Sequence, residues 1–274
     1  MIDDGNFGDR GSFYSYYDGQ VLMALAVYAE TGGPDKPGEV FGSYDCSARS
    51  VRETMNKVVD RSIAAQTPSG TCAGYWGYTG TGCDASTTQF TASGLGAAKG
   101  YYLTQGDPGG RLPAILTALD LTSNAYSANG KVSNGIYLFS DADCKTGAYP
   151  AGCLGHGYQQ NYGAPGSNQQ TASGTWLQLL GTGKNVNNAS VQGYMRWLRS
   201  AYNYNTNIYP ESWGASYFYY LWSSSKAYNF METMSVNAGN IGPADLGTLT
   251  AMSTNRLQNR VVASDSRVPQ RGTG

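Results

Sequence analysis

The sequence predicts an all-α fold made of repeated helix pairs. Apolar residues form 41% of the 274 residues, which is enough to bury a large core. Segments that are small or apolar on nearly all sides alternate with segments that are apolar on one face, as in buried and half-buried helices. Signals for β-strands are few, and residues 135–139 are the best short candidate.

A repeat supports this prediction. Residues 91–94 and 171–174 are both Thr-Ala-Ser-Gly, and weaker copies begin near Gln20 and Ser212. Each copy joins a Gly/aromatic loop to an apolar segment. We therefore expect residues 91–94 and 171–174 to be buried. The aligned glutamines should occupy equivalent first-turn positions of their helices, and these are Gln20, Gln89 and Gln169.

Amphipathic helices are expected between the buried ones. Residues 51–63 show the 3.6-residue period with one polar face, and residues 112–121 and 191–202 resemble them. Ser50 with Glu53, and Ser86 with Gln89, have capping-box spacing. The Gly- and Pro-rich stretches at 31–34 and 106–108 should end the buried helices.

Four buried and about three amphipathic helices follow from this pattern, which fades after Met234. Residues 1–234 are predicted to hold the repeats. Residues 235–274 are predicted to be a polar extension with one short helix near 244–252. The helix pairs can form an open solenoid or close into a ring. Because an unfinished ring leaves apolar faces in water, we expect a longer natural protein or a second chain that covers them.

Three segments resemble the repeat of terpenoid cyclases and protein prenyltransferases, also known as squalene-cyclase-like or prenyltransferase/squalene oxidase repeats. They are Gln66-Thr67-Pro68-Ser69-Gly70, Gly74-Tyr75-Trp76-Gly77-Tyr78 and Asp84-Ala85-Ser86-Thr87-Thr88-Gln89-Phe90. The resemblance implies an α/α toroid, here a partial one, in which inner and outer helices alternate around a central cavity.

The catalytic motifs of that family are missing. The cyclase motif Asp-x-Asp-Asp has its nearest match at residues 141–144, which lack the last acid. The prenyltransferase zinc site needs Asp, Cys and His, and His156 is the one histidine in the chain. No thioester motif of the complement type occurs. We therefore expect no cofactor and no metal, although Asp141 and Asp143 have the alternate spacing of calcium ligands.

Asp18 and Asp84 are the candidate catalytic residues, because both are expected just before buried helices, at the loop end of the proposed ring. Two carboxylates facing one cavity can act as general acid and base, as in glycoside hydrolysis. The alternative, which we favour, is that they cap helix starts.

Aromatic residues recur where loops enter the inner helices. We expect them to form a rim that binds an apolar or glycan ligand or a protein surface. Simple filling of the space between helices is the alternative, and for His156 the alternatives are a catalytic base and a loop histidine bonded to the backbone. The candidate rim residues are Tyr17, Trp76, Tyr78, His156, Tyr158 and Trp213.

The cysteines and the charges point to an extracellular, periplasmic or cell-surface protein. Cys72 and Cys83 bracket one loop and Cys144 and Cys153 another, so each pair is predicted to form a disulfide, with Cys46 left over. Charged residues are only 14% of the chain and the net charge is −1, without a basic cluster, which argues against a nucleic-acid partner. No apolar run reaches the length of a membrane span.

Two functional hypotheses remain. The first is a module that binds or scaffolds, with a protein partner or its own copies, and without catalysis. The second is an enzyme on a terpenoid, prenyl or glycan substrate that uses Asp18 or Asp84. The missing motifs favour the first.

Overall fold

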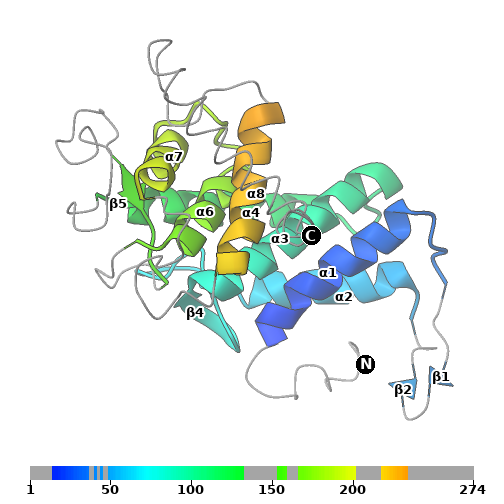
Figure 1. Cartoon of the computed structure of the whole chain (residues 1–274). Coiled ribbons are helices and arrows are strands. Elements are labelled where there is room, and N and C mark those ends of the chain that lie inside the picture. Colours follow the sequence, from blue (N-terminus) through cyan, green and yellow to red (C-terminus); the bar gives the residue numbers. More distant parts are fainter. Residues whose placement is uncertain are drawn as a thin grey trace. The chain divides into compact units, whose positions relative to one another are not determined.

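The computed structural model describes residues 14–36, 40–41, 44–45, 49–132, 153–158, 166–201 and 217–233 (Figure 1). The chain divides into two compact units. Unit 1 comprises Met1–Ala125 and Leu180–Gly183, and unit 2 comprises Tyr126–Leu179 and Lys184–Gly274. Seven helices and three short antiparallel strand pairs lie within the described residues. The prediction of an all-α fold is therefore confirmed for this part of the chain.

Unit 1 is a group of helices with two short hairpins. Its helices are α1 (Tyr14–Glu30), α2 (Val51–Ala64), α3 (Ala85–Gln105) and α4 (Leu112–Asn129), the last of which continues into unit 2 from Tyr126. The hairpins pair β1 (Val40–Phe41) with β2 (Tyr44–Asp45) and β3 (Trp76–Gly77) with β4 (Gly80–Asp84). Helix α1 lies along α3, and α2 packs on both, as Figure 1 shows.

The sequence signals for α2 are confirmed. Ser50 is its N-cap, and its side chain accepts a hydrogen bond from the Glu53 N–H while the Glu53 carboxylate accepts one from the Ser50 N–H. Met55, Val58 and Val59 form its buried stripe. Glu53 and Asp60 are exposed on the polar face, whereas Asn56 is half-buried and accepts a hydrogen bond from the Tyr102 hydroxyl at 2.6 Å.

Two glycines allow the close approach of α1 and α3. A Cβ atom on Gly94 would lie 2.6 Å from the Cα of Gly19, and one on Gly19 would overlap the backbone at Phe90. Thr91 reinforces the same seam, since its hydroxyl donates to the Ser15 carbonyl at 2.9 Å. The small residues of the repeat thus place two helix backbones in contact.

Unit 2 repeats the combination of a short strand pair and helices. Strand β5 (Lys131–Val132) pairs with β6 (Leu154–Gly155), and β6 packs on α7 (Ala189–Ala201) and α6 (Asn168–Leu177). Helix α6 also packs on α8 (Tyr217–Thr233) and on α7. The helices occur in the predicted order, with α2, α4 and α7 at the positions expected for amphipathic helices. The prediction is wrong for the burial of α7, because all of its residues from Ser190 to Leu198 are buried, including Gln192 and Arg196.

Some predictions on the fold need correction or lie outside the described residues. Helix α3 begins after Asp84, so Ser86 lies inside the helix and does not cap it. Helix α1 was expected to be buried on all sides, yet Val27 and Tyr28 are exposed. The segments 135–139 and 235–274 lie outside the described residues.

Candidate functional site

Asp18, the first candidate acid, is paired with an arginine. It lies on α1 with 2% of its side chain exposed, and both of its carboxylate oxygens accept hydrogen bonds from Arg61 of α2. The bond from the arginine Nε to Oδ2 measures 2.7 Å. This bidentate pair links α1 to α2, and both carboxylate oxygens are used as hydrogen-bond acceptors.

The protonation of Asp18 reflects two opposing effects. Burial raises the pKa of its carboxyl group above the ordinary value, and the hydrogen bonds and charge of Arg61 lower it again in part. Arg61 keeps 25% of its side chain exposed, so the pair lies at the edge of the core. Asp18 therefore has a structural role as the partner of Arg61.

Asp84, the second candidate acid, caps a helix. It is the last residue of β4 and the N-cap of α3, and its Oδ1 accepts a hydrogen bond from the Thr87 N–H at 2.6 Å. The side chain is buried and has the favourable position for a carboxylate at a helix N-terminus. The capping alternative is what the structure shows for this residue.

Trp76 lies in the core of unit 1 and not on an accessible rim. It is fully buried, and its indole N–H donates to the Ser62 carbonyl at 2.7 Å. Its backbone N–H donates to the hydroxyl of Thr88 at 2.9 Å. The space-filling alternative thus describes Trp76, because a large ring between β3, α2 and α3 satisfies its one donor inside the protein.

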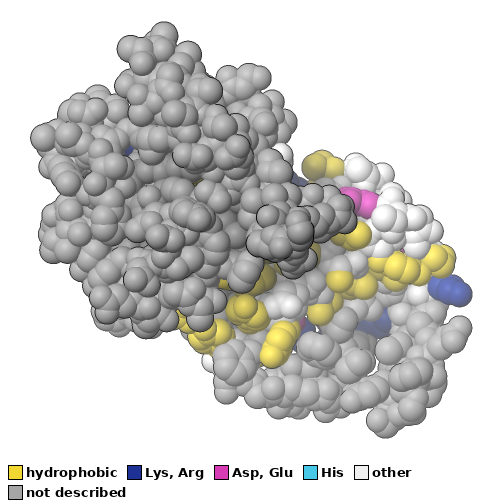
Figure 2. Space-filling view, in the orientation of Figure 1, with side chains coloured by type: hydrophobic (Ala, Val, Ile, Leu, Met, Phe, Trp, Pro, Cys, Tyr) yellow, Lys and Arg dark blue, Asp and Glu magenta, His cyan; other side chains and the backbone are white. Residues whose placement is uncertain are grey.

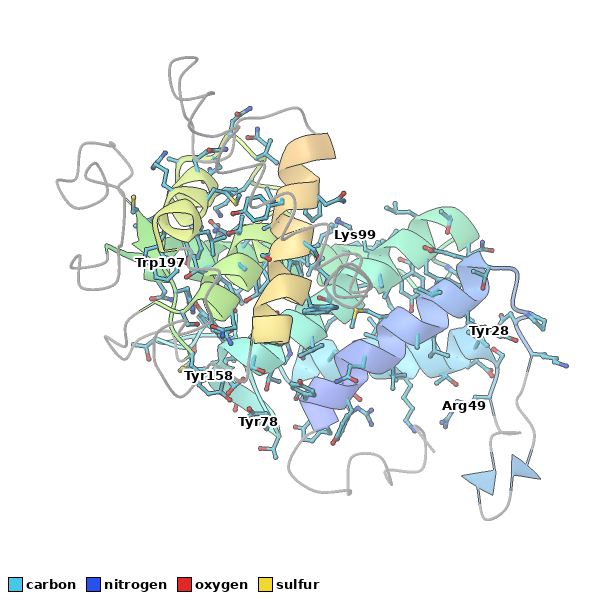
Figure 3. The ribbon with its side chains drawn as sticks, in the orientation of Figure 1. Tyr28, Arg49, Tyr78, Lys99, Tyr158 and Trp197 are labelled. Carbon is cyan, nitrogen blue, oxygen red and sulfur yellow. A yellow bond between two sulfur atoms is a disulfide. The ribbon has the colours of Figure 1, made fainter. Side chains whose placement is uncertain are left out.

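Tyr17 and Tyr78 do lie close together, around a third tyrosine. The Tyr16 ring centroid is 6.1 Å from that of Tyr17, 6.3 Å from that of Tyr78 and 4.4 Å from that of Phe90. Tyr17 is 39% exposed and the other three are half-buried. We call these four residues the aromatic patch. Figure 3 labels Tyr78 near the first turn of α1, where its carbonyl accepts from the Ser15 N–H.

The phenol group of Tyr16 is in its neutral form. Burial raises the pKa of the Tyr16 phenol, and the neighbouring Tyr78 and Asp84 raise it further, so the phenol stays neutral at physiological pH. A neutral phenol both donates and accepts hydrogen bonds. The patch therefore offers ring faces together with hydroxyl groups, which suits an amphipathic ligand.

His156 is a core residue of unit 2. It is 1% exposed, and its ring centroid lies 4.4 Å from that of Tyr126 and 6.4 Å from that of Tyr194. Its Nδ1 is 2.7 Å from the Gly157 carbonyl oxygen, and because a carbonyl only accepts, Nδ1 carries the proton. This is the geometry of the loop histidine bonded to the backbone. Tyr158, two residues later, is half-buried in the same unit.

The loop-to-helix junctions of the two units share one device. In unit 1 the N-cap is Asp84 and the Trp76 N–H donates to Thr88. In unit 2 the N-cap is Ser167 and the His156 N–H donates to Thr171 at 2.9 Å. In both junctions a threonine in the first turn of the helix accepts a hydrogen bond from the loop backbone.

This equivalence corrects the sequence alignment. Twelve positions separate Thr88 from Trp76, whereas fifteen separate Thr171 from His156. The two Thr-Ala-Ser-Gly stretches are buried or half-buried as predicted, but they lie three residues out of register relative to their helix starts. Gln169 lies in the first turn of α6 and Gln89 in the second turn of α3, while Gln20 is exposed on α1, so the prediction of equivalent first-turn positions is wrong.

The cysteine predictions have a partial outcome. The Cα atoms of Cys72 and Cys83 are 5.0 Å apart, which is a disulfide spacing, and their sulfurs lie at bonding distance. Cys153 is buried and disulfide-bonded. Its predicted partner Cys144 lies outside the described residues, as do Cys46, Trp213, Asp141 and Asp143.

The described residues contain neither a metal cluster nor a membrane-spanning helix. No group of three or more His, Cys, Asp or Glu side chains there is arranged to hold a metal ion. None of the described helices has the length and hydropathy of a membrane span.

Three important residues were not singled out from the sequence. Arg61 was assigned to the polar face of its helix, although an aspartate in an apolar helix signals a basic partner elsewhere. Ser167 caps α6, and a Ser three residues before Gln170 was the available signal. Lys226 lies over the rings of Trp222 and Trp176, and no sequence pattern around it indicates this contact.

Comparisons with known proteins give no relative. No protein-family model, curated protein or solved structure matches this chain. The resemblance to terpenoid cyclase repeats thus stays a prediction, and function is argued from the contacts described above.

Proposed function

We propose that the chain is a binding and assembly module, part of an α/α toroid, of an extracellular, periplasmic or cell-surface protein. In this proposal it lacks the cyclase and prenyltransferase chemistry of the family it resembles. The observation that carries the proposal is the outer face of α1, which is apolar and exposed.

Helix α1 has a buried inner face and an exposed outer face. The inner face packs in unit 1 through residues that are all buried, namely Ser15, Asp18, Gly19, Leu22 and Ala26. The outer face carries Val27, 58% exposed, and Tyr28, 42% exposed. Figure 2 shows hydrophobic side chains in a line along this helix, and Figure 3 labels Tyr28 near its C-terminal end. Exposed apolar surface of this kind marks interaction sites.

The outer face has the pattern of a helix–helix contact. Exposed residues recur along it at intervals of three or four positions, the spacing of a seam between paired helices, at Tyr17, Gln20, Ala24 and Val27. Tyr28 and Glu30 are exposed beside the last of these. Ala24 in the middle lets a second helix approach closely. Apart from Glu30 at its C-terminal end, α1 has one charged residue, the buried Asp18, so the middle of this face brings no like charges together when two copies pair. We therefore propose a second copy of the chain as the partner.

The size of the face sets the expected strength. A helix of 17 residues is about 25 Å long and about 10 Å wide, so its outer face covers about 250 Å². Stable complexes bury about 800 Å² on each partner. Pairing through α1 alone is therefore weak and depends on concentration.

Sedimentation velocity over a concentration series tests this proposal. We expect the wild type to shift from monomer toward dimer as concentration rises, and Val27→Glu to remain monomeric. Ala114→Glu is the matched control, because it adds the same charge at an exposed position of α4. Monomeric wild type throughout the series, or equal behaviour of the two variants, contradicts assembly through α1.

The aromatic patch supports a second part of the proposal, an apolar or glycan ligand. It combines ring faces with phenol groups at the start of α1. We expect Tyr17→Ala to weaken binding of a soluble polysaccharide in affinity electrophoresis, whereas Tyr28→Ala at the other end of α1 does not. Equal mobility of all three proteins with and without polysaccharide argues against a glycan ligand.

The alternative function, an enzyme on a terpenoid, prenyl or glycan substrate, has less support. Asp18 is engaged by Arg61, and Asp84 caps α3. Both carboxylates thus have structural partners that account for their presence.

A further inference from the structure

The exposed positions on the outer face of α1 are spaced symmetrically about Leu22. Tyr17 and Val27 lie equally far before and after it in the sequence, and so do Gln20 and Ala24, closer to it. When two identical helices pair antiparallel about a twofold axis, each residue lies opposite the residue equally far on the other side of the axis. With the axis at the level of Leu22, the outer face of one α1 therefore meets the same four positions of a second α1.

The sizes of these side chains favour the antiparallel orientation. In it, Tyr17 lies opposite Val27 of the second copy, and Gln20 lies opposite Ala24 of the second copy, so a larger side chain meets a smaller one at each level. In a parallel pair each residue meets its own copy. Two tyrosines then crowd one end of the contact, and two alanines leave a gap nearer its middle. Because close packing requires an even separation along the contact, the antiparallel pair packs better.

The charges at the two ends of α1 also distinguish the orientations. Glu30 is exposed at the C-terminal end, and the last turn holds no basic residue to offset its charge. The first turn holds no acidic residue. A helix carries partial positive charge at its N-terminus and partial negative charge at its C-terminus, so an antiparallel pair places Glu30 near the positive end of the second α1. A parallel pair brings two Glu30 carboxylates and two negative helix ends together.

We propose that two copies of the chain pair through α1 in an antiparallel orientation, with a twofold axis at the level of Leu22. This inference rests on the assembly proposed above, and it adds the orientation and the residues that meet. A twofold contact of this kind uses the same surface on both copies, so it is closed and leaves no outer face of α1 for a third chain. The assembly through α1 therefore ends at the dimer.

Cysteine cross-linking of the full-length chain tests the orientation. Gln20→Cys and Ala24→Cys are prepared separately, mixed in equal amounts at the highest concentration of the sedimentation series, and oxidised. Peptide mapping by mass spectrometry then identifies the cysteines that are joined. We expect the bond between positions 20 and 24 to form at several times the combined yield of the 20–20 and 24–24 bonds. Random encounter gives equal yields of mixed and combined like bonds, so a mixed yield no greater than the combined yield overturns the proposal.

A control variant separates specific pairing from collision. Leu103→Cys places a cysteine at a position of α3 that is 68% exposed and lies outside the outer face of α1. Mixed with Ala24→Cys, it should give no excess of the bond between positions 103 and 24. An excess equal to that of the 20–24 bond overturns the assignment of residue pairs.

Glu30→Gln provides a second test, in which the two orientations predict opposite signs. In the antiparallel dimer it removes two favourable contacts with helix N-termini, so the dissociation constant should rise about threefold or more. In a parallel dimer it removes a repulsion, and the dissociation constant should fall. Glu53→Gln is the matched control, because it removes the same charge at an exposed position of α2 and should leave the dimer unchanged. An unchanged or tighter dimer of Glu30→Gln overturns the antiparallel orientation.

The outcomes also separate this inference from the assembly on which it rests. Wild type that stays monomeric throughout the concentration series overturns both. A dimer that Val27→Glu abolishes, but whose cross-links join like positions and which tightens in Glu30→Gln, supports assembly through α1 and overturns the antiparallel orientation alone.

Discussion

The two loop-to-helix junctions are built on the same backbone scheme and filled in different ways. In unit 1, Asp84 caps α3 and Thr88 holds the backbone of Trp76, whose indole fills the core. In unit 2, Ser167 caps α6 and Thr171 holds the backbone of His156, which lies between two tyrosine rings. The hydrogen bonds of the backbone therefore define the junction, and the aromatic residue beside it is free to vary.

The second difference concerns the glycines of the shared Thr-Ala-Ser-Gly stretch. Gly94 contacts the backbone of α1 at Gly19, whereas a Cβ on Gly174 would lie 2.6 Å from a ring carbon of Tyr194 and 2.7 Å from one of Tyr126. The same Thr-Ala-Ser-Gly sequence thus packs against a helix backbone in unit 1 and against tyrosine rings in unit 2. A shift of three residues relative to the helix start turns the face that each position presents.

The largest expected effect concerns the buried ion pair of unit 1. Arg61→Met leaves the Asp18 carboxylate buried without its partner, so we expect a loss of about 3–5 kcal/mol in the free energy of unfolding. Asp18→Asn should cost less, because Arg61 reaches solvent. Arg111→Met is the control, since its partner Asp60 is 55% exposed and such surface pairs contribute at most about 1 kcal/mol.

The stability of the Arg61→Met variant should depend on pH in a definite direction. Without Arg61, the already raised pKa of Asp18 rises further, so the folded state binds a proton more strongly than the unfolded state. The stability of Arg61→Met should therefore increase as pH falls toward this pKa and decrease as pH rises through it. Urea unfolding from about pH 4 to pH 7 measures this. A flat profile argues against a buried, unpaired carboxylate.

The glycines give the next largest effect and test the difference between the seams. We expect Gly94→Ala to cost about 3 kcal/mol, because α1 and α3 must separate, and Gly174→Ala to cost about 1–2 kcal/mol, because rings can turn. Gly100→Ala in α3 is the control, since its Cβ has nothing nearer than the Glu30 carboxylate at 3.9 Å. It should be neutral or stabilising by up to about 1 kcal/mol. Thermal and urea unfolding measure all three variants. An equal loss of unfolding free energy at positions 94 and 174 would contradict a difference between the two contacts.

The smallest effect tests the similarity of the junctions. Thr88→Val and Thr171→Val each leave one buried backbone N–H without its acceptor, so each should cost about 1–3 kcal/mol, by similar amounts. Thr→Ser at either position keeps the hydroxyl and should restore most of the loss. Amide hydrogen exchange at Trp76 and His156 reads out the bond directly. Loss of stability at one position alone shows that the two junctions are not equivalent.

The sequence by itself determined the local elements. The 3.6-residue period and the Ser50 capping box placed α2, and glycine-rich stops placed the ends of α1 and α3. These signals depend on contacts within a few residues, which a sequence pattern records directly. The repeat likewise predicted the burial of residues 91–94 and 171–174.

The tertiary structure decided the partners. It joined Asp18 to Arg61 across 43 positions, set the three-residue shift between the repeats, and placed Lys226 between indoles of two helices. It also left one face of α1 in solvent, although its composition predicts a buried helix. Which face a side chain meets depends on how helices from distant parts of the chain pack. Residues that align between two copies of a repeat need not lie at the same position relative to the start of their helices.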